Sequence, residues 1–211
     1  MISAVVLSAG LSTRMGGEPK GLLRFDDRDT FLTRIVRTLN EAGVHDVVVV
    51  LGHEASRVLE SVQQSGLVAR CVVNERYRDG QFSSLLTGLA EVDRPEVSGM
   101  LLALVDAPLF SVSTVHAIVE RFERTQAPVV RAVRGAEHGH PVVIGRSLFR
   151  ALREADPSLG AKPIVRAHAS ETGDVTVDDP GAFVDIDTPE DYAQLPDTIR
   201  QLTRHDRSAR R

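Results

Sequence analysis

A glycine-bearing loop follows the first apolar run of the chain and has the composition of an anion-binding site. Residues 7–23 read LSAGLSTRMGGEPKGLL, with two basic side chains, Arg14 and Lys20, among four glycines. Backbone N–H groups in such a loop can hold phosphate oxygens, and the two cations can offset the charge of a triphosphate. The spacing matches neither GxxxxGK[ST] nor GxGxxG. An ordinary βα turn with solvated Arg and Lys is the alternative interpretation.

Two acidic segments could hold a metal ion. Asp106 closes the apolar run MLLALVD two residues before Pro108, and Asp185 and Asp187 lie in the later segment VDIDTPEDY. Mg²⁺ prefers one or two carboxylates together with phosphate oxygens, and alternate residues of an extended stretch point to one side. The competing interpretations are an Asp-x-Pro turn at Asp106 and, at the later segment, a helix that starts with Pro189.

Residues 74–89, NERYRDGQFSSLLTGL, contain a further candidate binding element. Gly80 can supply a special backbone angle, and Ser83 or Ser84 can cap the helix that follows. Helix capping alone would explain one of the two serines.

Residues 138–168 offer side chains for a second substrate. His138 and His140 are two residues apart, but without further Cys or His partners nearby we do not expect a zinc site. A helix that begins near Gly160 would carry Lys162 in its first turn, where it could bind an anionic acceptor such as a phosphate monoester. Simple exposure of Lys162 to solvent is the alternative.

Apolar β-branched runs alternate with amphipathic stretches, which indicates an α/β fold. Continuous hydrophobic strands predict a doubly wound, mostly parallel Rossmann-like sheet with helices on both faces, in three α/β/α layers. Ligands then lie at the carboxyl ends of the strands, so we expect functional residues just after Leu7, Val73 and Val105. Pro141 predicts that the last strand lies near an edge or a bend. Strands are expected at residues 2–7, 46–51, 69–73, 100–105, 129–133 and 141–144, and helices at 30–42, 55–64, 83–92 and 112–124.

The composition is that of one globular domain. The chain has 211 residues, 42% of them hydrophobic, and a net charge of −4. The acidic balance argues against a nucleic-acid-coating protein, and no apolar run reaches the ~20 residues of a membrane span. A single cysteine, Cys71, and the absence of a secretory leader indicate the cytoplasm. We expect a domain over residues 1–196 and a basic, mobile tail over 197–211, which holds five Arg and two Asp.

The loop LSAGLSTRMGGEPK resembles the LAAGxSxRMGxxK signature of the nucleotidyltransferases that activate sugar phosphates, isoprenoid precursors and molybdopterin. It departs from that signature at Ser8 and by one extra residue before the lysine. The resemblance implies contacts of the loop's first residues with the base and ribose, and of Arg14 and Lys20 with the triphosphate. The implied nucleotide-binding residues in this loop are Leu7, Ala9, Gly10, Ser12, Arg14 and Lys20.

Five later segments resemble further motifs of the same enzymes. Gly80 and Ser84 match a G-x-x-x-S-L-x-x-G element that lines the nucleobase pocket. Asp106 matches a D-x-P motif, and the D-x-D-T-P-E-D segment implies Asp187, with Asp185 as the alternative, as the second metal ligand. The G-H-P triplet with His140, and a G-A-R-like helix start at Gly160 and Lys162, resemble the acceptor side of molybdopterin nucleotidyltransferases. There Ser158 and Leu159 replace the expected aspartate.

The resemblance is to the molybdenum cofactor nucleotidyltransferase family, in its cytidylyltransferase branch. It implies transfer of CMP from CTP to molybdopterin with release of pyrophosphate, with Mg²⁺ as the cofactor and Arg14, Lys20 and Asp106 as catalytic residues. The A-G form of the loop favours CTP over GTP, since the guanylyl branch more often carries G-G. Guanylyl transfer to molybdopterin, cytidylyl or uridylyl transfer to a sugar or alcohol phosphate, and a non-catalytic cofactor-delivery protein remain alternatives. The basic tail suggests docking to a molybdoenzyme.

Overall fold

The structure is a computed structural model that describes the backbone of residues 1–209 and the side chains of residues 1–202. Its centre is a seven-stranded sheet in the order β3-β2-β1-β4-β6-β5-β7. β6 pairs antiparallel with both of its neighbours, and the other pairings are parallel. The mostly parallel doubly wound sheet is therefore confirmed. The strands are Ile2–Ser8 (β1), Val47–Leu51 (β2), Arg70–Val73 (β3), Gly99–Leu104 (β4), Val129–Arg134 (β5), Glu137–Gly145 (β6) and Asp174–Thr176 (β7).

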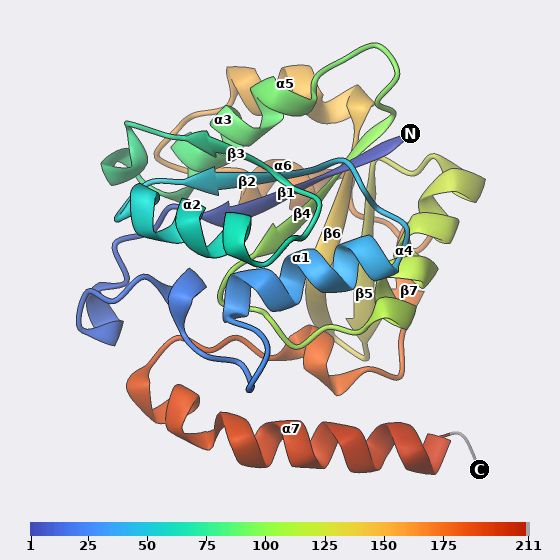
Figure 1. Cartoon of the computed structure of the whole chain (residues 1–211). Helices are drawn as coiled ribbons and strands as arrows, with labels where there is room; N and C mark the ends of the chain where they lie inside the picture. Colours follow the sequence, from blue (N-terminus) through green and yellow to red (C-terminus); the bar gives the residue numbers. More distant parts are fainter. Residues whose placement is uncertain (210–211) are drawn as a thin grey trace.

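Helices cover both faces of this sheet, as Figure 1 shows. One face packs its apolar side chains against α1, α2 and α4, and the other packs against α3, α5 and α6. The three-layer α/β/α prediction is thus also confirmed. The α-helices are Phe31–Glu41 (α1), Ala55–Gln64 (α2), Gln81–Val92 (α3), Val112–Thr125 (α4), Phe149–Glu154 (α5), Lys162–His168 (α6) and Pro189–Ala209 (α7). Short 3-10 helices are Thr13–Met15 (η1), Lys20–Leu22 (η2), Tyr77–Asp79 (η3), Arg146–Leu148 (η4) and Pro180–Phe183 (η5).

Local sequence explains where the longer helices start. Thr30 and Thr33 form a capping box at α1, in which the Thr33 backbone N–H donates to Thr30 Oγ1 and the Thr30 N–H donates to Thr33 Oγ1. Ser111 caps α4 by accepting the Thr114 N–H. These caps satisfy backbone donors that a helix leaves unpaired at its first turn.

The position of β6 corrects one prediction and supports another. Pro141 lies in a strand between β4 and β5, so the expectation of an edge is wrong. The expectation of a bend is confirmed, because the pairing of β5 with β6 shifts register between Arg131 and Val133. Pro141 has no N–H to donate, and it falls in this irregular stretch between the paired residues His138 and Val142.

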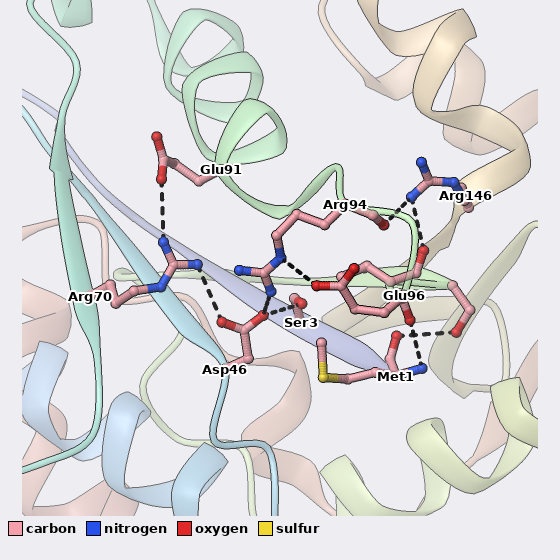
Figure 2. Close-up of polar contacts among 10 residues, drawn as sticks. Met1, Ser3, Asp46, Arg70, Glu91, Arg94, Glu96 and Arg146 are labelled. Carbon is pink, nitrogen blue, oxygen red and sulfur yellow. Dashed lines mark hydrogen bonds and ion pairs between the residues drawn. The ribbon is translucent and has the colours of Figure 1, made fainter.

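A network of ion pairs closes the sheet at the amino ends of the parallel strands, shown in Figure 2. Asp46, just before β2, accepts hydrogen bonds from Ser3, Arg94 and Arg70, the last at 3.2 Å. Burial alone would raise the pKa of Asp46, but the bonds from Ser3, Arg70 and Arg94 lower it. Arg70 also reaches Glu91 at 3.3 Å, which ties β3 to α3. The network therefore holds the strands together at their amino ends, opposite to their carboxyl ends.

The last helix, α7, runs along the bottom of the molecule in Figure 1. Its buried Leu195 packs in a cluster with Phe31, Leu109 and Ile186. The helix crosses from residue 196 to residue 197, where the predicted tail begins, and continues to Ala209. The last two residues of the predicted tail, 210 and 211, lie outside the described residues. No helix within the described residues is both long and apolar enough to cross a membrane.

Candidate active site

Most of the predicted nucleotide-site residues line one cavity of about 330 Å³ at the carboxyl ends of β1 and β4. The cavity is formed by segments that follow three different strands and by the turn that precedes α7. The predicted residues that line it are Leu7, Ala9, Gly10, Ser12, Arg14, Lys20, Gly80, Ser84, Asp106 and Asp187. The chain thus brings together residues that are up to 180 positions apart in the sequence.

The glycine loop is held in shape by its own hydrogen bonds. Ser12 adopts a left-handed backbone conformation, φ 49°, that costs energy for a residue other than glycine. Its carbonyl accepts the N–H groups of Met15 and Gly17, and its Oγ accepts the N–H of Lys20 at 3.0 Å. Because these donors are satisfied inside the loop, the part that faces the cavity is the preceding stretch, residues 10–14.

Lys20 connects the loop to both predicted metal carboxylates. Its Nζ donates to Asp187 Oδ1 at 2.7 Å and lies 3.8 Å from Asp106 Oδ2. Arg14 lies 3.5 Å from the other oxygen of Asp187 and is mostly exposed. Two cations and two carboxylates from distant segments therefore meet at the mouth of the loop.

The segment that carries Asp187 is fixed to the end of β4. The Ile186 N–H donates to the Asp106 carbonyl at 2.7 Å, and the buried Ile186 side chain anchors the segment. Asp187 begins the turn into α7, where Asp191 Oδ2 accepts the N–H groups of Asp187 and Thr188. The helix-start interpretation is confirmed, because α7 begins at Pro189, and Asp187 also lines the cavity.

Asp106 is the more buried of the two carboxylates that contact Lys20. Its Oδ1 is fully buried and has no hydrogen-bond partner among the described residues. Burial raises the pKa of Asp106, Lys20 lowers it, and the neighbouring Asp185 and Asp187 raise it further. Such an oxygen is available to a cation. Asp185 is exposed. Both Asp185 and Asp106 interact electrostatically with His140.

A divalent ion fits this donor set. Within the described part of the chain no group of three or more His, Cys, Asp or Glu side chains is close enough to hold a metal ion alone. Mg²⁺ usually takes only one or two carboxylates and fills its other positions with water and substrate phosphate oxygens. The free Asp106 Oδ1 and the nearby Asp187 match that requirement.

The two serines in the first turn of α3, Ser83 and Ser84, differ in part from the predicted role of capping this helix. The helix begins at Gln81, with Gly80 at φ 99° before it, so neither serine is the N-cap residue. Ser83 Oγ donates to the carbonyls of Arg76 and Gly80, which fixes the turn. Ser84 is buried, lines the cavity and accepts a bond from Asn74 Nδ2 at 3.0 Å.

The three acceptor-side candidates line a second cavity of about 590 Å³ next to the first. His140 enters it from β6, and Gly160 and Lys162 from the start of α6. Burial lowers the pKa of His140, and Asp185 and Asp106 act in the opposite direction. The ring Nδ1 is buried without a partner among the described residues. Leu7, Gly80 and Gln81 line both cavities.

Among the residues of this cavity that sequence reasoning missed, three come from the segment after β3: Tyr77, Arg78 and Gln81. Tyr77 lies in η3, where its Cβ packs closely against Gly52, and the Arg78 guanidinium lies 5.6 Å from the centre of its ring. A signal was present, because all three fall within residues 74–89, which the sequence already indicated as a candidate binding element. Side-chain direction in an irregular turn could not be read from spacing.

A mostly parallel sheet with this strand order, a cationic loop after β1, and two carboxylates, one after β4 and one before α7, define an α/β nucleotidyltransferase. Residues 4–172 match the MobA-like NTP transferase domain, and the chain belongs to this family. It is therefore an enzyme of the nucleotidyltransferase type.

Comparisons with individual proteins place the similarity over nearly the whole chain. The chain is 30% identical to the nicotine blue oxidoreductase of Paenarthrobacter nicotinovorans, over 92% of this chain and 96% of that protein. It is 24% identical to the molybdenum cofactor guanylyltransferase of Shewanella sediminis, over 94% and 97%. The crystal structure of Rv0371c from Mycobacterium tuberculosis matches with a TM-score of 0.76 at 30% identity, over 92% and 96% of the two chains. Rv0371c has also been solved in complex with manganese.

Proposed function

We propose that this nucleotidyltransferase transfers CMP from CTP to molybdopterin with release of pyrophosphate, using Mg²⁺. The observation that carries the proposal is the arrangement of Arg14, Lys20, Asp106 and Asp187 around one cavity, directly beside a second cavity large enough for an acceptor. A molybdenum cofactor guanylyltransferase among the relatives supports the acceptor class. The single half-buried cysteine, Cys71, supports a reducing, cytoplasmic setting.

The reaction is an in-line displacement at the α-phosphorus of the nucleotide. An oxygen of the acceptor's phosphate forms the new bond to this phosphorus, and the bond from the phosphorus to the pyrophosphate oxygen breaks. The acceptor phosphate is already ionised near neutral pH, so no protein nucleophile is required. The protein acts by positioning and electrostatics.

Each group of the nucleotide site has a defined task in this mechanism. Residues 10–14 hold the triphosphate, and Arg14 and Lys20 offset the charge that grows on pyrophosphate as it leaves. Asp106 and Asp187 would hold Mg²⁺, which supplies further neutralisation of the reacting phosphates. Gly80 and Ser84 line the same cavity and contact the base in this proposal.

The acceptor binds in the second cavity in this proposal. Lys162 at the start of α6 meets the acceptor's phosphate, and His140 lies on the side of this cavity nearest to Asp106. Since Leu7, Gly80 and Gln81 border both cavities, the two substrates meet at these residues.

The choice of CTP rests on the loop sequence Ala9-Gly10, and three related reactions are the alternatives. These are guanylyl transfer to molybdopterin, cytidylyl or uridylyl transfer to a sugar or alcohol phosphate, and cofactor delivery without turnover. Asp106→Asn separates the last one, because a delivery protein tolerates this change and a transferase loses orders of magnitude in rate.

The basic end of the chain, residues 197–211, is proposed to dock the enzyme to a molybdoenzyme. The proposal rests on charge alone, since the residues before it carry a net charge of about −7 and this end a net +3. If deleting residues 197–211 leaves partner binding unchanged, this docking role is refuted.

The test incubates the purified protein and Mg²⁺ with CTP, GTP, UTP or ATP, with and without molybdopterin, and measures pyrophosphate. We expect release with CTP only when molybdopterin is present. Release with GTP would move the assignment to guanylyl transfer, and release only with a sugar or alcohol phosphate would refute molybdopterin as the acceptor. Because one relative is named an oxidoreductase, a parallel sample tests reduction of nicotine blue by NADH. Dye reduction without any pyrophosphate release would refute nucleotidyl transfer by this chain.

A further inference from the structure

The side chain that should bind the triphosphate is already engaged by the carboxylates that should bind the metal. Lys20 Nζ is 2.7 Å from Asp187 Oδ1 and 3.8 Å from Asp106 Oδ2, and the lysine side chain is only 12% exposed. Arg14 also reaches Asp187, but its side chain is 70% exposed, so the buried counter-charge comes from Lys20. In this arrangement the lysine ammonium neutralises the two carboxylates from within the protein.

The backbone of Lys20 is fixed, so a change of partner must occur in its side chain. The Lys20 N–H donates to Ser12 Oγ, and the residue opens η2. The next residue, Gly21, is packed so tightly that a Cβ there would lie 2.7 Å from Ser8 Oγ and 3.4 Å from Leu32 Cβ. The flexible four-carbon stem of lysine is therefore what can move its charge from one partner to another.

Charge at the site favours such a move when both ligands arrive. Asp185 and Asp187 both act electrostatically on Asp106, and the two cations Lys20 and Arg14 offset only part of the charge of these three carboxylates. A divalent cation at Asp106 and Asp187 would repel the ammonium from that position. A triphosphate beside the loop would attract it, because both interactions act at close range in a partly desolvated cavity.

We propose that Lys20 is an internal counter-ion that occupies the metal carboxylates in the free enzyme and passes to the triphosphate when the metal binds. Metal and nucleotide binding are then positively coupled through this one side chain. The metal alone must displace the ammonium, and the nucleotide alone must draw it away from Asp187. This inference rests on the proposed use of Asp106 and Asp187 as metal ligands.

The test measures binding of Mn²⁺ alone, by titration calorimetry or by the electron paramagnetic resonance signal of free Mn²⁺, without nucleotide or acceptor. Lys20→Met keeps the length and apolar stem of the side chain and removes its charge. We expect Lys20→Met to bind Mn²⁺ at least about fivefold more tightly than the wild type. The same variant should bind metal-free CTP more weakly, because the triphosphate loses a cation.

Two variants control for other causes of a change in affinity. Arg78→Met removes a positive charge from the same cavity, but the Arg78 guanidinium lies over the Tyr77 ring, so its Mn²⁺ affinity should stay within about twofold of the wild type. Adding Asp106→Asn to Lys20→Met should abolish the gain, which places the bound ion at this carboxylate. Thermal unfolding confirms that each variant is folded.

Unchanged or weaker Mn²⁺ binding by Lys20→Met would overturn the inference, as would an equal gain in Arg78→Met. The result is independent of the assay for the proposed function. Tighter Mn²⁺ binding without pyrophosphate release would leave the counter-ion role standing and refute the proposed transfer to molybdopterin. Pyrophosphate release without a change in Mn²⁺ affinity would do the reverse.

Discussion

Removing one partner of the buried ion pair between Asp29 and Arg37 should lower stability strongly, and this is a direct test of the packing around α1. Arg37 Nε and Nη2 donate to the two oxygens of Asp29 at 2.8 and 2.9 Å. The side chains are 4% and 13% exposed, respectively, for Asp29 and Arg37. Asp29→Asn removes the charge while keeping the shape, and it leaves the guanidinium buried without its counter-ion.

The expected cost follows from this geometry. Removing one partner of a buried ion pair costs roughly 3–5 kcal/mol, and the residual exposure of Arg37 favours the lower end, about 3 kcal/mol. For a chain of this length 1 kcal/mol shifts the unfolding midpoint by roughly 2–4 °C, so we expect a decrease of about 6–12 °C. Differential scanning calorimetry and urea unfolding of the purified variant measure both quantities.

An exposed pair provides the matched control. Asp197 and Arg200 are 2.9 Å apart, with both side chains 73% exposed. Asp197→Asn should therefore change stability by less than about 0.5 kcal/mol. Replacing both buried partners, as Asp29→Leu with Arg37→Met, should recover most of the loss, because no unpaired charge remains. Equal effects of Asp29→Asn and Asp197→Asn would refute the reasoning.

The same pair predicts a pH dependence. Hydrogen bonds from Arg37 lower the pKa of Asp29, although burial acts in the opposite direction. The unfolded chain therefore binds a proton at this group more readily than the native protein does. The stabilisation is complete above the unfolded pKa of about 4 and is lost as the pH falls through the lower native pKa. The stability difference between wild type and Asp29→Asn should shrink in acid, as urea unfolding from pH 7 to pH 3 would show.

Three further predictions address the site and its supports. Asp106→Asn should lower the rate of pyrophosphate release at least about 100-fold while CTP binding persists, and a loss below tenfold would contradict a metal-binding role. Gly88→Ala should cost about 1–3 kcal/mol, because its Cβ would lie 2.4 Å from Val5 Cγ1 where α3 meets β1; unfolding at the wild-type midpoint would disprove this contact. Burial lowers the pKa of His140, so its ring should titrate with a midpoint below pH 6.5 in an NMR titration. The free energy of unfolding should then rise with pH through this region, because the unfolded chain binds the proton at a higher pH than the native protein does. A titration midpoint of His140 at or above 6.5 would contradict this prediction.

The sheet could be predicted well because its strands carry a strong, local signal. Runs such as DVVVVL admit little besides a strand buried on both faces, and the expected ranges agree with β1, β2 and β4 to within one or two residues. β7 was not predicted, since three residues carry no periodic pattern. The reversal of β6 also escaped, because a strand's direction depends on pairing that one segment does not encode.

A site residue could be predicted where a side chain suited to binding phosphate or metal comes directly after a buried strand. Asp106 and the loop from Leu7 to Lys20 satisfied both conditions, and they line one cavity. Ion-pair partners could not be predicted, because the approach of Lys20 to Asp187 depends on how the turn before α7 folds back over β4. The same holds for Tyr77, whose position depends on its close contact with Gly52.

The antiparallel direction of β6 divides the work of the site along the chain. β6 starts at the carboxyl ends of the parallel strands, so its early residue His140 lies beside Asp106. Residues up to 106 supply nearly all of the first cavity. The second cavity, which we propose binds the acceptor, draws most of its polar side chains from residues 140–165. Under this proposal, a chimera joined between α4 and β5 should exchange the acceptor preference and retain the nucleotide preference.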